Sequence, residues 1–447
     1  MTTGDMAADG EASKASPVRG VVHGGLVIAV VVGLAVVTNA FYESWAVGDF
    51  ATTRLAPQAR YNVRAAVASS SLAEAWANYP GVWPPLYPTL LYAAVAAGVP
   101  LGRFNQVLFY LTLAWTALLF RRHIPSLSLA APIALFAVAV YQYENLRFPF
   151  SEPLFVLLSL VCYERLLHYQ ERPSWARLLG LATACAAVCL TRYNGLLWML
   201  PLCVLGVLAG RGRRSERVGR AGLLAAASLI PVALWMLYQY AQTGFFTGMD
   251  RLGPRRIRFF LFLRGVDLRD PITNLKLALS TLCEDLLALP FALLKMEIGQ
   301  GLKLQIEQPL LLLFACLGLG IVGWLLWSLR PEPTEKRFEN TAPRWSTAFR
   351  RPGPLAAMFF GVYFTEMVAI WTVSNPDPIN TRFVYPCYAF LLIWAFDAYA
   401  KLRDQGGTAV LRRGLQVGFG VLLILHIYRS AQPLLAGLLH SLRVLSS

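Results

Sequence analysis

Apolar segments of membrane-spanning length recur along this chain of 447 residues. Four clear examples are residues 23–41, 104–120, 127–143 and 153–169. Crossing a bilayer core of about 30 Å takes roughly 20 predominantly apolar residues in a helix. Hydrophobic residues make up 56% of the sequence and charged residues only 15%, an apolar share larger than a soluble domain needs for its core. We therefore expect an all-α polytopic membrane protein rather than a soluble domain on a single anchor.

Arginine and lysine concentrate in short segments between the apolar runs, and such segments favour the cytoplasmic side of a membrane. Placing all of them inside gives about 11 transmembrane helices, within a range of roughly 10–13. Residues 1–20 are then a disordered cytoplasmic N-terminus, and 330–352 form a cytoplasmic linker within a C-terminal group of helices, 301–447. The five basic segments are 121–122, 172–177, 211–220, 330–351 and 401–413.

Two long segments fall on the outer face in this arrangement, 42–103 and 242–307. Residues 86–99 are apolar but too short to span, and a span here would move two basic segments outside. We expect this run to lie at the interface or to re-enter the membrane, and both outer loops to carry interfacial helices. For residues 432–445, both an interfacial helix and a last span remain open.

The net charge of +15 does not predict nucleic-acid binding, because the basic residues lie beside apolar runs and form no soluble basic domain. The seven cysteines fall mostly within apolar runs, without paired spacing, and are interpreted as small core residues. The five histidines are scattered over both faces, so no metal site is predicted. The sequence contains no P-loop or dinucleotide fingerprint.

Several charged residues are candidates for chemistry on the outer face. Asp49 follows the first apolar run closely and suits either a general base or an ordinary solvated loop acid. Arginines at outer ends of spans run against the charge rule, and a phosphate ligand would account for them. The alternatives for them are contact with lipid headgroups or pairing with nearby acids. The arginines are Arg147, Arg192, Arg256 and Arg382.

Two acids and two aromatic residues complete the candidate set. Glu144 and Glu152 flank Arg147 and suit either acceptor binding or a structural ion pair. Trp83 and Tyr87 suit either stacking on a sugar or anchoring at the headgroup level.

Five pieces of sequence, in this order, resemble the GT-C superfamily of glycosyltransferases, which use polyprenyl-phosphate sugar donors. An acid soon after the first span precedes Trp83-Pro84-Pro85-Leu86-Tyr87-Pro88, as in the first outer loop of that superfamily. Three further pieces follow: residues 147–153, 191–195 and 243–248. The last is Arg382-Phe383-Val384-Tyr385-Pro386. The resemblance covers roughly residues 20 to 400 and includes protein mannosyltransferases and aminoarabinose transferases among the similar proteins.

The resemblance implies a catalytic module over 21–300 that works at the outer, periplasmic face of the inner membrane. Asp49 would be the catalytic base, and Arg192 and Arg382 would hold the leaving phosphate. The acceptor would be a hydroxyl group of a lipid, glycan or protein. No organic cofactor is implied, and assistance by a divalent cation stays open. Subfamilies with a paired acid in this loop differ from the present chain, where Phe50 follows Asp49.

Two other functions are compatible with the same features. A transporter or flippase of lipid-linked saccharides would also need polar groups in the membrane, although the sequence indicates neither charge near the midplane nor a two-fold repeat. A polysaccharide polymerase or ligase would share the chemistry and differ in using diphosphate-linked donors.

Overall fold

The computed structural model of the protein describes residues 57–79, 83–124, 150–244, 349–374 and 381–404, and within these ranges all regular elements are helices. The prediction of an all-helical chain is confirmed for this part. The helices are α2 (Pro57–Val67), α3 (Leu72–Asn78), α4 (Leu86–Ala96), α5 (Leu101–His123), α7 (Glu152–Glu171), α8 (Trp175–Thr191), α9 (Asn194–Leu197), α10 (Met199–Ala209), α11 (Arg214–Thr243), α17 (Pro352–Ser374) and α18 (Thr381–Asp404).

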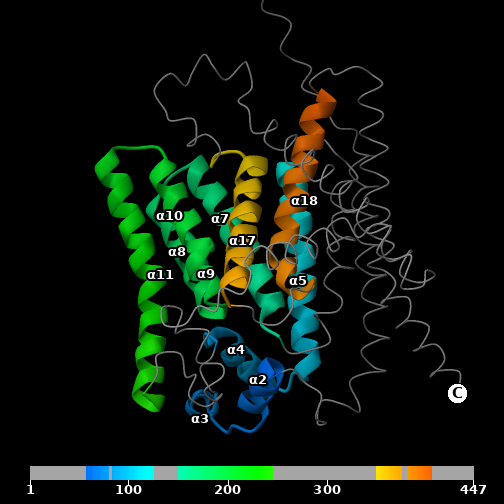
Figure 1. Cartoon of the computed structure of the whole chain (residues 1–447), viewed down its shortest axis with the longest axis vertical. Coiled ribbons are helices and arrows are strands. Elements are labelled where there is room, and N and C mark those ends of the chain that lie inside the picture. Colours follow the sequence, from blue (N-terminus) through cyan, green and yellow to red (C-terminus); the bar gives the residue numbers. More distant parts are fainter. Residues whose placement is uncertain (1–56, 80–82, 125–149, 245–348, 375–380, 405–447) are drawn as a thin grey trace, which may run out of the picture.

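The longer helices form one bundle, in which neighbours along the chain pack side by side (Figure 1). α7, α8, α10 and α11 follow each other up and down, while α17 and α18 pack on each other, α18 packs on α7, and α17 contacts α10. Trp198 is buried where these groups meet, and its indole Nε1 donates to the Phe359 carbonyl at 2.7 Å. Tyr163 donates its hydroxyl to the Pro352 carbonyl at 2.7 Å. A side chain of α7 and one that directly precedes α10 thus hold the backbone of α17, although the segments are far apart in sequence.

Residues in turns fix where α8 begins and where α11 ends. Ser174 precedes α8, and its hydroxyl accepts from the Arg177 N–H, satisfying one donor that the first helical turn leaves free. Gly244 ends α11 in the left-handed region, with φ of 76°, where glycine carries no Cβ penalty. The helix directions are therefore set locally, and with them the end of the bundle to which each polar segment goes.

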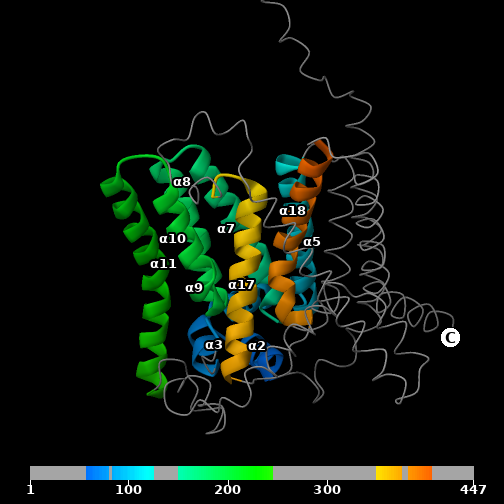
Figure 2. The same ribbon diagram turned by 45° about the horizontal axis from the view of Figure 1, so that its top comes forward.

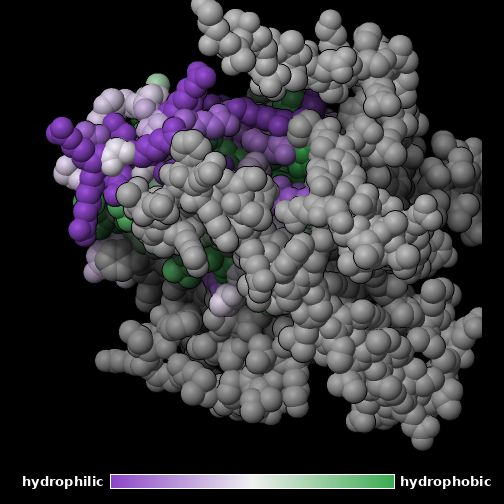
Figure 3. Space-filling model, turned by 90° about the horizontal axis from the view of Figure 1, so that it is seen from above, coloured by the Kyte–Doolittle hydropathy of each residue, from purple (hydrophilic) through white to green (hydrophobic). Residues whose placement is uncertain are grey.

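The described parts of the five basic segments lie together at one end of the bundle. They belong to the last turn of α5, the α7–α8 and α10–α11 connections, the residues before α17, and the end of α18. All are at the upper end in Figures 1 and 2. A view onto this end shows hydrophilic residues gathered there (Figure 3). This agrees with the one-sided distribution that the charge pattern predicts.

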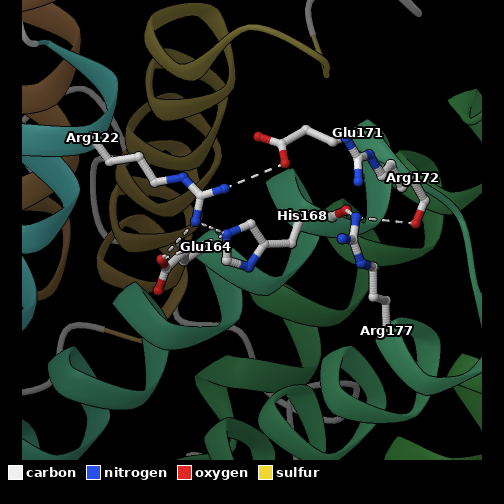
Figure 4. A network of polar contacts seen from close by, with 6 residues as sticks. All are labelled: Arg122, Glu164, His168, Glu171, Arg172 and Arg177. Carbon is white, nitrogen blue, oxygen red and sulfur yellow. Dashed lines mark hydrogen bonds and ion pairs between the residues drawn. The ribbon is translucent and has the colours of Figure 1, made fainter.

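A polar network at this basic end joins α5, α7 and α8 (Figure 4). Arg122 of α5 lies 3.6 Å from the Glu164 carboxylate and 3.3 Å from that of Glu171, and it also contacts His168. Arg177 of α8 donates to the carbonyls of His168 and Arg172. The side chains of Arg122 and Arg177 at this end therefore join the ends of neighbouring helices.

Three short helices, α2, α3 and α4, lie at the opposite end of the bundle (Figure 1). α4 has 11 residues, so it is about 16 Å long and too short to cross a bilayer. α5 starts at the same end, directly after α4. Residues 86–99 therefore do not take the chain from one end of the bundle to the other, and their interfacial or re-entrant position stays a prediction.

Several of the predicted basic loops are partly helical: residues 121–122 belong to α5, 175–177 to α8 and 401–404 to α18. Residues 211–220 are expected to be a connecting loop, but α11 already begins at Arg214. Arg217 is held there because its Nη1 donates to the Leu208 carbonyl at 2.6 Å. Among the described helices, α11 is the one whose length and apolar composition suit a membrane crossing by themselves, which is weak support for a membrane protein.

Candidate functional site

A buried ion pair lies at the end of the bundle opposite the basic network. Arg192 directly follows α8, and its Nη1 lies 2.7 Å from Glu152 Oε1 in the first turn of α7. The side chains are only 12% and 1% exposed. Ser151, the residue before α7, is 3.4 Å from the same nitrogen. Removing two charges from solvent is costly unless they pair well, so this contact fixes the ends of α7 and α8 against each other.

Glycine at position 195 lets the chain turn tightly after Arg192. Gly195 N donates to the Arg192 carbonyl at 2.9 Å, and α9 begins within this turn. A Cβ added at Gly195 would lie 2.9 Å from Val188 Cγ1 and 3.0 Å from the Cys189 amide nitrogen. Glycine therefore allows α9 to approach the last turn of α8, which places Arg192 beside α7.

One edge of the Arg192 guanidinium makes no hydrogen bond to a described residue. A guanidinium group has five N–H donors, and both contacts to Glu152 and Ser151 use Nη1. The aromatic ring of Phe155 lies 5.9 Å from Arg192 Cζ. The Nη2 and Nε donors could thus bind a further anion bidentately without loss of the Glu152 contact.

Two tyrosines from the short helices interact with this pair. Tyr79 follows α3, is buried, and interacts electrostatically with Arg192. Burial raises the pKa of the Tyr79 hydroxyl, and this effect outweighs the opposing effect of Arg192. Tyr87 of α4 is fully buried, donates to Asn105 Oδ1 at 2.7 Å, and interacts electrostatically with Glu152. The layer of short helices therefore borders the ion pair.

A second carboxyl group belongs to the same region. Glu366 is the only charged residue of α17. It interacts electrostatically with Arg192, and Tyr363, one turn earlier, interacts with Arg192, Glu152 and Glu366. Both carboxylate oxygens of Glu366 are buried and have no hydrogen-bond partner. About 12 Å of helix separate Glu366 from the end of α17 at Ser374.

The expectation that no charge lies near the middle of an apolar run is therefore wrong for α17. Glu366 was absent from the predicted site residues, although a lone acid in an apolar helix is a sequence signal in its own right. The ion-pair partner of Glu152 is also not the arginine nearest to it in the sequence. Arg147 is only five positions away, but the contact is made by Arg192 from the next helix.

Of the predicted aromatic residues, Tyr87 is enclosed by protein and packs against Phe104, with ring centroids 5.8 Å apart. Trp83 is partly buried and packs on a cluster that contains Tyr79 and Trp235. Both rings thus contribute to packing of the short helices. Four predicted residues lie outside the described part of the chain: Asp49, Glu144, Arg147 and Arg256. For Arg382 the structure describes the backbone, in the first turn of α18.

The cysteines form the one group among the described residues that could hold a metal ion. The sulfur atoms of Cys162, Cys185 and Cys203 lie within 4.8 Å of one another, on α7, α8 and α10. The Cys162 and Cys203 sulfurs are 3.5 Å apart. Soft ions bind such thiolates, but all three groups are fully buried among apolar residues. Because deprotonated thiols would be costly in these surroundings, we interpret them as core residues.

Comparison with known proteins gives no relative. No model of a protein family matches the sequence. No curated protein and no solved structure is significantly similar to it.

Proposed function

We propose that this protein is a membrane glycosyltransferase that moves a sugar from a polyprenyl-phosphate donor to an acceptor hydroxyl at the outer face of the membrane. The observation that carries the proposal is Arg192, a guanidinium anchored through Nη1 to Glu152, whose other nitrogens make no hydrogen bond to a described residue. A leaving phosphate requires its developing negative charge to be neutralised, and a guanidinium does this with two parallel hydrogen bonds.

The membrane arrangement is part of the proposal. About 11 transmembrane helices would place the basic end of the bundle in the cytoplasm and α2, α3 and α4 at the outer face of the inner membrane. Arg192 and Glu152 would then lie just inside the outer boundary, beneath the short helices. A donor held by a membrane-embedded prenyl chain would present its phosphate at this depth, which suits a basic group at the end of a span.

The roles of the other residues follow from the resemblance to the GT-C superfamily. Asp49 would take the proton of the acceptor hydroxyl as it attacks the anomeric carbon, while the bond from that carbon to the phosphate oxygen breaks. Arg382 would share the phosphate with Arg192. The donor carries its own activated bond, so the reaction needs no nucleotide site. The acceptor would be a lipid, a glycan or a protein.

Purified protein in detergent, given a radiolabelled lipid-linked sugar and a mixture of membrane acceptors, should form a labelled product. Replacement of Asp49 by Asn removes the base but keeps the size of the side chain, and should reduce transfer by at least about 100-fold. The matched control is Asp250→Asn, at an acid also predicted to lie on the outer side and given no role. Full activity in Asp49→Asn would refute Asp49 as the base, and absence of product in the unaltered protein would refute transfer from a polyprenyl-phosphate donor.

A transporter or flippase of lipid-linked saccharides is the second candidate, and Glu366 favours it. A buried acid far inside a helix is typical of proteins that couple transport to protons. The same assay separates the two classes, because a flippase moves its lipid across vesicles without forming a new glycosidic bond. A polymerase or ligase would form the bond only with diphosphate-linked donors.

A further inference from the structure

The carboxyl group of Glu366 makes no hydrogen bond to the described part of the protein. Both oxygens of its carboxyl group are buried without a hydrogen bond. A buried polar group without a partner costs about 1–3 kcal/mol relative to a paired one. α17 contains no other charged residue and is mostly apolar, so a leucine at this position would fit the pattern of the helix. An acid here therefore destabilises the fold and calls for a role other than packing.

The charges around Glu366 indicate which protonation state it can hold. Among the side chains that the structure describes, Arg192 is the cation with which Glu366 interacts, and Arg192 is already paired with Glu152 at 2.7 Å. Two ionised carboxylates would leave one negative charge uncompensated in a place of low dielectric constant, which is strongly unfavourable. The neutral carboxyl group, which has one O–H donor and a carbonyl acceptor, avoids this cost.

We propose that Glu366 binds the hydroxyl groups of a sugar in a donor site beside the ion pair of Arg192 and Glu152. A neutral carboxyl group donates one hydrogen bond and accepts another, and a sugar hydroxyl does the same, so the two are complementary without transfer of charge. Arg192 would bind the phosphate and Glu366 the sugar attached to it. This inference rests on the proposed function and extends it to recognition of the donor sugar.

The test compares an unglycosylated lipid phosphate with four of its sugar esters. Geranylgeranyl phosphate is the first probe, and its mannosyl, glucosyl, galactosyl and arabinosyl esters are the second. Dissociation constants are measured by thermal shift and by microscale thermophoresis for the wild type, Glu366→Gln and Glu366→Leu. Glutamine keeps a donor and an acceptor, whereas leucine has neither and matches the apolar helix. Thr365→Val is the control, since Thr365 is exposed and its hydroxyl bonds only to the Gly361 carbonyl of its own helix.

The expected result is that Glu366→Leu weakens binding of the preferred sugar ester by about tenfold or more, the value of one or two hydrogen bonds. Its affinity for the unglycosylated phosphate should stay unchanged, and its melting temperature should equal or exceed that of the wild type. Glu366→Gln should retain binding within about threefold. This combination of a more stable protein with weaker sugar binding cannot result from a purely structural role.

Other outcomes overturn the proposal in distinguishable ways. Equal affinity of Glu366→Leu and the wild type for every ester would remove Glu366 from sugar recognition while the proposed transfer reaction stands. Loss of ester binding in Glu366→Gln as well as in Glu366→Leu would show that an ionised carboxylate is needed, and would favour a cationic ligand instead. A wild type that binds neither lipid would refute both the inference and the donor class on which it rests.

Discussion

At the scale of single residues, the Arg192–Glu152 pair makes opposite demands on stability and function. Each charge is buried, so loss of either partner leaves the other uncompensated, at a cost of about 3–5 kcal/mol. Loss of both removes that penalty. The stability of the protein therefore depends on the two side chains together, whereas phosphate binding depends on Arg192 itself.

We expect Glu152→Gln and Arg192→Gln each to lower the melting temperature in detergent, and the double variant to melt above the less stable of them. Transfer activity should not return in the double variant, because it lacks the guanidinium. A thermal melt and a transfer assay on the four proteins complete this double-mutant cycle. Recovery of activity along with stability would mean that Arg192 is structural only.

At the scale of helices, the position of Arg192 depends on how closely α9 approaches α8. Gly195→Ala should destabilise the protein by about 1–3 kcal/mol, because the new methyl group meets the backbone of α8 at Cys189. It should also reduce transfer beyond the loss of folded protein, since displacement of α9 shifts Arg192.

The matched control is Gly222→Ala in α11, where a Cβ meets nothing within 4 Å. That change should be neutral or slightly stabilising, because alanine has the higher helix propensity. Chemical denaturation and activity are measured for both variants. If the two substitutions behave alike, close packing at Gly195 does not position the site.

The same scale shows what could be predicted from the sequence. The apolar run at 153–169 indicates α7, and the basic residues indicate which helix ends lie together, because both signals are local and repeated. The pairing of Glu152 with Arg192 could not be predicted, since it depends on the turn at Gly195 bringing a second helix alongside. Glu366 had a visible signal, but Arg192, with which it interacts, lies 174 residues earlier in the sequence.

At the scale of the whole molecule, the prediction concerns which end of the bundle faces the cytoplasm. Ala73 in α3 and Arg211 before α11 are both exposed, at opposite ends. In intact spheroplasts, a membrane-impermeant maleimide should label Ala73→Cys and spare Arg211→Cys until the membrane is opened. The unaltered protein gives the background, and its five described cysteines are all buried. Labelling of Arg211→Cys alone in intact cells would invert the orientation and place Arg192 on the cytoplasmic side.

The hydrogen bond from Trp198 to the Phe359 carbonyl also has a consequence for biosynthesis. Its two ends are 161 residues apart, so at about 5–20 residues per second the ribosome needs roughly 8–30 s to supply the second after the first. During that interval Glu152 and Arg192 exist without α17, and Glu366 has not been made. A nascent chain therefore holds an incomplete site, with the face of α7 that receives α17 uncovered, and chains terminated before residue 352 should be preferred substrates of membrane proteases.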